Sequence, residues 1–264
     1  MSRPDEPTAL ARADDLLRAP ARRDFLRVLG AGGTLLLLPT VFTACDDDDD
    51  ITPPGGGGAF ALDLRTDTGI LNYAYALEQL EAAFYTAVVA SAAFGGMTAE
   101  QREVLVDLRN HEVIHREFLR AALGTAAIPS LALSASAVAA VTADAPTILR
   151  NAEAFEDLGV AAYNGAGKYL ASADLLTLAG KIVSVEARHA AAIRDLRDSA
   201  GRRFAGDDVV LPPGGAFEGL DVKLEPAPVL AAVGGTRLVT SPLAIGNAPA
   251  ARAGTPDFAP PATT

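Results

Sequence analysis

A long apolar stretch that contains two acidic residues constrains the fold most strongly. From Thr68 to Ala99 the only charged side chains are Glu78 and Glu81, and aliphatic and aromatic residues surround them. A helix that is apolar on all sides is buried, and a buried carboxylate is costly unless it is paired, protonated or bound to a metal. The stretch therefore predicts a central helix that carries a polar site into the core.

Three further segments have the apolar periodicity of helices. They are predicted over about 99–123, 146–172 and 175–203. A capping box at Thr98 and Gln101 begins the first of them, Asp144 ahead of Pro146 begins the second, and Asp174 caps the third. Together with the apolar helix, these segments predict four helices.

The connections between the helices indicate how they are arranged. The stretch from Thr125 to Ala145 is too long for a hairpin turn and too apolar for a loose linker, so we expect it to cross over the bundle. Two helical hairpins joined by one long crossover predict an all-α four-helix bundle. Glycines at 159, 165 and 167 predict close packing or a bend in the third helix. Beyond Phe204 the chain is rich in Pro and Gly, and only Val229–Val233 is predicted to be helical.

Four short motifs on the predicted helices contain the candidate metal ligands. Two have the form Glu-x-x-His, Glu112–His115 and Glu186–His189, and two have the form Glu-x-x-Glu, Glu78–Glu81 and Glu153–Glu156. Residues three apart on a helix lie on the same side of it. The chain has only three histidines, and two of them follow a glutamate by three positions, which chance rarely produces. Four helices that turn such pairs inward predict a pocket for two metal ions.

Two tyrosines indicate which glutamate of each Glu-x-x-Glu motif is the metal ligand. Tyr85 follows Glu78 by seven residues, and Tyr163 follows Glu156 by the same interval. Seven residues are close to two helical turns, so we expect each phenol to lie near that glutamate and to orient it by a hydrogen bond. This favours Glu78 and Glu156 as ligands. The alternates are Glu81 and Glu153.

The same region also fits a different metal site. Residues His111–His115 read His-Glu-Val-Ile-His, which satisfies the H-E-x-x-H pattern of zinc metalloproteases. In that interpretation His111 and His115 bind zinc and Glu112 activates water. No strand is predicted before this helix, and the Glu186–His189 motif is left unexplained, so this remains a remote alternative.

The N-terminal segment has the features of an export signal. Arg22-Arg23, followed by an apolar stretch too short to span a bilayer, resembles a twin-arginine signal. Cys45 resembles the lipidated cysteine of a bacterial lipobox, and the acidic and Gly-rich residues after it resemble a solvated tether. We therefore expect an exported protein of the periplasm or cell envelope, attached to the membrane only through a lipid on Cys45.

The net charge and the cysteine count argue against two other classes of protein. The net charge of −11 argues against a nucleic-acid partner, because binding to phosphates requires a basic surface. A single cysteine excludes an intramolecular disulfide framework. We divide the chain into a signal (1–45), a linker (46–66), a helical bundle (67–203) and an irregular tail (204–264).

Residues 68–203 resemble the ferritin-like superfamily, and most closely the exported ferritin-like proteins related to plant desiccation-associated proteins. The segments that carry the resemblance are Leu77–Tyr85, Phe155–Gly159 and Val185–His189. The resemblance implies a di-iron or di-manganese carboxylate centre. It implies that Glu112 and Glu186 bridge the two metals, that His115 and His189 each bind one metal, and that Glu78 and Glu156 are terminal ligands.

Hard oxygen ligands with only two imidazoles suit iron, or else manganese, better than copper. The expected activity is ferroxidase-like or peroxide-scavenging, with O₂ or peroxide as the small oxidant. The alternative from another class is a non-enzymatic structural protein of the cell envelope that acts in desiccation stress, since a fold does not determine a function. The sequence predicts no oligomeric state.

Overall fold

The computed structural model describes residues 60–198, 203–214, 217–241 and 243–250. The expected export signal with Arg22 and Arg23, the expected lipidation site Cys45 and most of the expected linker lie outside these residues.

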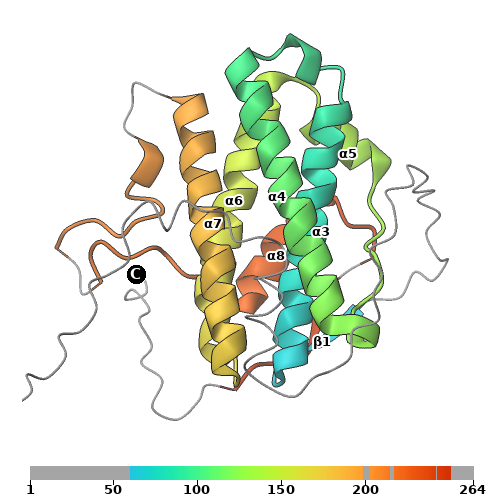
Figure 1. Ribbon diagram of the computed structural model, residues 1–264, viewed down its shortest axis with the longest axis vertical. Coiled ribbons are helices and arrows are strands. Elements are labelled where there is room, and N and C mark those ends of the chain that lie inside the picture. The colour runs from blue at the N-terminus through green and yellow to red at the C-terminus, as the bar shows by residue number, and fades with distance from the viewer. Residues whose placement is uncertain (1–59, 199–202, 215–216, 242, 251–264) are drawn as a thin grey trace, which may run out of the picture. The chain divides into compact units, whose positions relative to one another are not determined.

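Four long helices run side by side in the described part of the chain (Figure 1). They are α3 (Asp67–Ala90), α4 (Ala99–Leu123), α6 (Ala145–Ala166) and α7 (Ala173–Arg197). Helix α3 packs mainly against α4, and α6 packs mainly against α7. The predicted all-α bundle of two helical hairpins is therefore confirmed. Within the described residues, no helix is both long enough and apolar enough to cross a membrane.

The helix starts agree with the predicted caps in two of three cases. Thr98 and Gln101 form the expected capping box, and Asp144 accepts a 2.7 Å hydrogen bond from the backbone of Thr147. The cap of α7 is Ser172 and not Asp174, which lies in the first turn. The carboxylate of Asp67 accepts a hydrogen bond from the Ser172 backbone, and this contact between distant residues fixes the turn before α7.

Two helices end earlier than the sequence pattern predicts. Helix α6 ends at Ala166 and continues only as the short 3-10 helix η3 (Gly167–Tyr169), because its glycine-rich end packs against another part of the chain. A Cβ at position 165 would lie 1.8 Å from the carbonyl oxygen of Leu224. Helix α7 ends at Arg197, one residue after the last apolar residue of its inner face.

The connections between the long helices include short helices. The crossover begins with η2 (Gly124–Ala126) and contains α5 (Ala135–Val141), while η1 (Phe94–Gly96) lies in the first hairpin and η4 (Arg203–Ala205) follows α7. Two buried amides of α3 hold the crossover in place. The Asn72 amide nitrogen donates to the carbonyl of Ala126, and Gln79 accepts from the backbone of Leu131 at 2.8 Å. The crossover is therefore an ordered cover on the bundle.

The tail is more regular than predicted. Helix α8 spans Pro226–Thr236, twice the expected length, because proline is tolerated in the first turn of a helix. Strand β2 (Leu243–Asn247) pairs in parallel with β1 (Phe60–Asp63), and β1 lies within the segment expected to be a linker. Helix α8 packs on α6, so the tail covers the outside of the bundle.

Candidate metal centre

Six side chains from the four long helices meet in the middle of the bundle. They form two groups of close potential metal ligands, Glu78, Glu112, His115 and Glu186 in one, and Glu112, Glu156, Glu186 and His189 in the other. Within each group the ligand atoms all lie within 4.8 Å of one another. All six residues are buried except His115, which is partly exposed. The structure thus brings together the six residues that the sequence predicts as ligands.

Two carboxylates belong to both groups, and their oxygens face different imidazoles. Glu112 Oε2 lies 3.4 Å from His115 Nδ1, and its Oε1 lies 2.8 Å from His189 Nδ1. Glu186 has the same relationship, with Oε1 2.9 Å from His115 Nδ1 and Oε2 3.4 Å from His189 Nδ1. Carboxylates placed in this way can bridge two cations. The geometry fits the bridging role that the resemblance implies for Glu112 and Glu186.

Several ligand atoms of the two groups form ion pairs with one another but no well-formed hydrogen bond among the described residues. Eight buried atoms are in this position: Glu78 Oε2, Glu156 Oε2, both carboxylate oxygens of Glu112 and of Glu186, and Nδ1 of His115 and His189. Leaving buried polar groups unsatisfied is unfavourable, and so many in one place call for an explanation. The carboxylate oxygens and imidazole nitrogens lie 2.8–3.5 Å apart without the geometry of hydrogen bonds, as ligand atoms that point at a common cation would. The donor set therefore fits two metal ions, with four carboxylate charges balancing two divalent cations.

The two predicted tyrosines do contact ligands, but each contacts the glutamate of the other hairpin. Tyr85 donates a 2.5 Å hydrogen bond to Glu156 Oε1, and Tyr163 donates one of 2.5 Å to Glu78 Oε1. The expectation that each tyrosine would contact the glutamate on its own helix is wrong. Seven residues along a helix separate side chains by about 10 Å, too far for a hydrogen bond. The antiparallel pairing of α3 with α6 supplies the partner instead.

The alternates Glu81 and Glu153 lie outside both groups. Glu153 forms an ion pair with Arg197 of α7. Glu81 is buried, and its Oε1 would lie 3.0 Å from a Cβ at Gly159, so the absence of a side chain there makes room for this carboxylate. The structure thus favours Glu78 and Glu156 over these alternates as members of the site.

The third histidine has a contact that the sequence pattern did not predict. His111 Nδ1 lies at hydrogen-bond distance, 2.9 Å, from His189 Nε2, and the planes of the two rings are only 12° apart. His111 belongs to neither group of potential ligands in the described residues. The zinc-protease arrangement, in which His111 and His115 share a metal, is therefore not formed. The H-E-x-x-H pattern is the sequence feature that indicates His111, because it places this residue one helical turn from His115.

Charge interactions in the metal-free site favour protonated imidazoles. Burial alone lowers the pKa of His115, but the neighbouring carboxylates of Glu112, Glu186 and Glu78 raise it to about 12. The pKa of His189 is raised to about 12 in the same way. Burial raises the carboxyl pKa of Glu78 well above its usual range, and nearby carboxylates add to this effect. A divalent cation would have to displace protons from this site.

The phenols remain protonated for a related reason. Burial, and then the charge of the adjacent glutamate, raise the hydroxyl pKa of Tyr85 and of Tyr163 well above the usual value. A protonated phenol can only donate its hydrogen to a carboxylate. Both tyrosines therefore fix the orientation of a terminal ligand over the whole physiological pH range.

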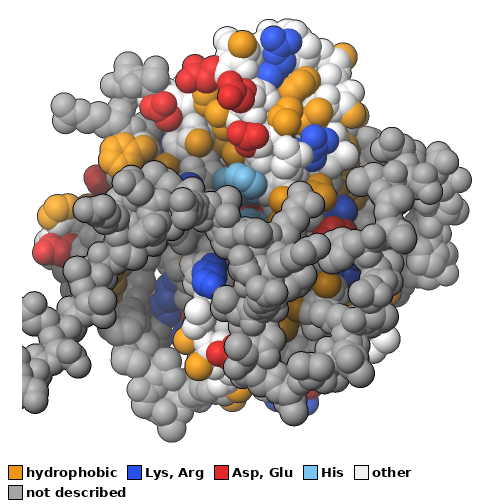
Figure 2. All heavy atoms as spheres, viewed as in Figure 1, with side chains coloured by type: hydrophobic (Ala, Val, Ile, Leu, Met, Phe, Trp, Pro, Cys, Tyr) orange, Lys and Arg blue, Asp and Glu red, His pale blue; other side chains and the backbone are white. Residues whose placement is uncertain are grey.

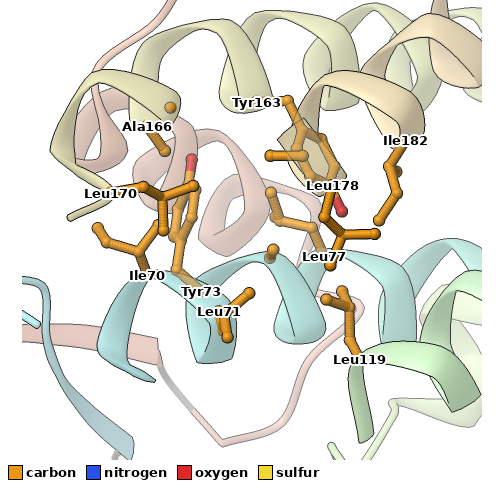
Figure 3. Close-up of a pocket in the computed structure, with 13 residues that line it drawn as sticks. Ile70, Leu71, Tyr73, Leu77, Leu119, Tyr163, Ala166, Leu170, Leu178 and Ile182 are labelled. Carbon is orange, nitrogen blue, oxygen red and sulfur yellow. The ribbon is translucent and has the colours of Figure 1, made fainter. Parts of the chain in front are cut away.

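An apolar pocket lies where the first turns of α3 meet the last turn of α6, with Ile70, Tyr73 and Ala166 in its lining (Figure 3). Its empty space is about 420 Å³, including its opening to solvent, and the lining comes from all four long helices. Leu77, next to Glu78 in sequence, and Tyr163, the hydrogen-bond donor to Glu78, are part of this lining (Figure 3). The pocket therefore reaches the residues that support one terminal ligand.

Histidine side chains also reach the surface on one face of the molecule, with acidic and apolar side chains near them (Figure 2). His111 is exposed, whereas the side chain of His115 is 12% exposed and that of His189 only 4%. The imidazole side of the site thus lies close to solvent. The terminal glutamates, Glu78 and Glu156, are fully buried.

Comparison with known proteins places this arrangement in a family. The family model described as a ferritin-like domain matches residues 66–199, which include all four long helices. No curated protein matches the chain.

Proposed function

Because this chain belongs to the ferritin-like domain family, we propose that it is a di-metal oxidoreductase that holds two iron ions and oxidises them with a small oxidant. Manganese is the second choice of metal. The observation that carries the proposal is the set of eight buried ligand atoms without hydrogen-bond partners among the described residues. Six of these atoms are carboxylate oxygens, which suit iron and manganese better than copper.

The chemistry that bound iron would supply is electron transfer to the oxidant. In the peroxide reaction, two Fe(II) and one H₂O₂ take up two protons and give two Fe(III) and two H₂O. In the O₂ reaction, two Fe(II) and one O₂ take up two protons and give two Fe(III) and one H₂O₂. Both reactions balance in atoms, charge and electrons, and neither needs a further reductant.

The residues of the chain prepare the site for this chemistry. Glu112 and Glu186 face both imidazoles and would hold two ions next to each other. The Tyr85 and Tyr163 hydroxyls hold the two terminal carboxylates, and such supporting contacts usually affect metal affinity by about 10–100-fold. The apolar helices around the site exclude water from the terminal ligands.

The apolar pocket favours O₂ over peroxide as the oxidant. An apolar lining favours small apolar molecules, and O₂ is apolar whereas hydrogen peroxide is not. The pocket touches Leu77 and Tyr163, and so it adjoins the support of Glu78. We expect O₂ to be consumed faster than peroxide at equal concentrations.

The test begins with the metal content of protein purified from its native compartment. Two metals per chain are expected, with an ultraviolet–visible spectrum typical of oxidised iron. The purified protein is then supplied with Fe(II), and consumption of O₂ and of peroxide is compared with that of the Glu112→Ala variant. Loss of a bridging carboxylate should abolish the accelerated consumption. Circular dichroism of the variant establishes that it is folded.

Other outcomes would favour other functions. A folded wild-type protein that binds two metals but consumes neither oxidant faster than Glu112→Ala would contradict the oxidoreductase proposal. Protein without metal would support the alternative of a structural protein of the cell envelope. The His111→Ala variant tests the remaining alternative, the zinc protease. Loss of all metal from this variant would support the zinc-protease interpretation.

We also propose that the protein is exported and is anchored to the membrane by a lipid on Cys45. The sequence features in its favour are the Arg22-Arg23 pair and the acidic stretch that follows Cys45. Detergent phase partitioning of the mature protein tests the anchor. Wild-type protein should enter the detergent phase and Cys45→Ser should not. Recovery of all wild-type protein in the aqueous phase would exclude the lipid.

A further inference from the structure

The candidate metal centre has an approximate twofold symmetry. Glu112 approaches His189 at 2.8 Å, and Glu186 approaches His115 at 2.9 Å. The hydrogen bonds from Tyr85 to Glu156 and from Tyr163 to Glu78 are equal in length. Each of these contacts of one hairpin thus has a counterpart in the other.

His111 breaks this symmetry. It precedes His115 by four residues on α4, and on α7 the residue four before His189 is Val185. The His111 ring contacts the opposite imidazole, that of His189, through a 2.9 Å nitrogen–nitrogen contact, and the two ring planes are nearly parallel. Valine has no hydrogen-bonding side chain, so Val185 cannot give His115 an equivalent partner.

The atoms involved determine the direction of the hydrogen bond. The Nδ1 atom of His189 faces Glu112 and Glu156, so it is the atom available to a metal. A neutral imidazole that binds a metal through Nδ1 carries its hydrogen on Nε2. His189 Nε2 then donates to His111 Nδ1, and the other nitrogen of His111 carries a hydrogen toward the surface. Such a partner fixes both the tautomer and the ring orientation of a ligand.

We propose that His111 is a positioning residue for His189 and makes the two metal positions unequal. The position formed by Glu112, Glu156, Glu186 and His189 binds its metal more tightly than the position that contains His115. This inference rests on the proposed metal site but not on its activity, because it concerns affinity alone. It assigns a role to the one histidine that is not a candidate ligand.

Titration of the metal-free full-length protein with Co(II), followed by absorbance and calorimetry, tests the proposal. The wild type should show two binding steps of different affinity. His111→Ala should weaken the tighter step by about 10–100-fold and leave the other unchanged. His111→Asn should retain most of the affinity, because the Asn side-chain oxygen can accept in place of Nδ1. Ile114→Ala, an exposed side chain on the same helix, is the control and should change neither step.

A double-mutant comparison identifies which metal position responds. The effect of His111→Ala should persist in a His115→Ala background and disappear in a His189→Ala background. Equal weakening of both steps, an unchanged titration, or no rescue by asparagine would overturn the proposal. Absence of any Co(II) binding by the wild type would overturn it together with the proposed function. Two unequal steps with the predicted response, but no oxidant consumption, would uphold it while the oxidoreductase proposal fails.

Discussion

The Tyr85 hydroxyl on α3 donates a 2.5 Å hydrogen bond to the Glu156 carboxylate on α6. The reciprocal bond runs from Tyr163 on α6 to Glu78 on α3. Each hairpin therefore orients a terminal ligand that the other hairpin supplies. The centre is completed only when the two hairpins pack together, which links metal affinity to the assembly of the bundle.

The first prediction concerns these phenols. Tyr85→Phe removes the donor to Glu156 and should lower the affinity for one metal by about 10-fold or more, since contacts that orient ligands have effects of this size. Competition with a chromophoric chelator measures the change. Tyr73→Phe is the matched control, because Tyr73 is equally buried and its hydroxyl has no hydrogen-bond partner among the described residues. Equal losses in both variants would contradict the orienting role.

The second prediction separates Glu78 from Glu81, which lie one turn apart on α3. Glu78→Gln replaces a charged oxygen in one ligand group and should remove or greatly weaken one metal. Glu81→Gln changes a buried carboxyl outside both groups and should leave two metals per chain. Metal analysis after gel filtration measures the number of metal ions per chain in both variants. Loss of a metal only in Glu81→Gln would exchange the roles of the two residues.

The sequence could predict the candidate ligands because their spacing is a local property. Glu112 with His115, and Glu186 with His189, lie three residues apart, and helical periodicity turns both members of each pair to one side. The buried position of Glu78 followed from the apolar residues around it. The four-helix architecture could be predicted for the same reason, since it depends on periodicity and on loop length.

Contacts between distant segments could not be predicted in this way. The pairing of Tyr85 with Glu156 and the contact of His111 with His189 depend on how the helices are aligned, which no local pattern specifies. The pairing of β1 with β2 joins the start of the bundle to the tail, and neither strand has a strong alternating pattern. The sequence pattern predicts too short a helix α8, because its prolines favour irregular structure in general but are tolerated in the first turn of a helix.

The third prediction concerns the pH dependence of stability in the metal-free protein. The pKa of His115, and likewise that of His189, is about 12 in the folded protein and about 6.5 in an unfolded chain. A pKa raised by folding stabilises the protein fully below pH of about 6.5, and the contribution is lost as the pH rises toward 12. The melting temperature of the chelator-treated protein should therefore fall as the pH rises above about 6.5.

Bound metal should counteract this fall in melting temperature, because metal binding requires neutral imidazoles and releases their protons. The difference in melting temperature between Mn(II)-loaded and chelator-treated protein should increase between pH of about 6 and pH of about 8.5. Replacing both ligand histidines with alanine should remove both effects. A difference that stays constant or shrinks with rising pH would show that these imidazoles are neither protonated in the metal-free site nor ligands in the loaded one.

The fourth prediction concerns the docking of the tail on the bundle. A Cβ at Gly165 would lie 1.8 Å from the carbonyl oxygen of Leu224, whose own backbone N–H donates to the carbonyl of Ala161. Gly165→Ala must separate the tail from α6, and it should reduce the free energy of unfolding by about 1–3 kcal/mol in urea titrations.

Gly180→Ala provides the matched comparison for this prediction. Gly180 lies in the interior of α7, and nothing lies within 4 Å of the Cβ that alanine would add. Alanine is the better helix former, so this variant should be more stable than the wild type by about 0.5–1 kcal/mol. The same substitution should thus have opposite signs on two helices of the bundle. Stabilisation by both substitutions would mean that the tail does not pack against α6 at Gly165 in solution.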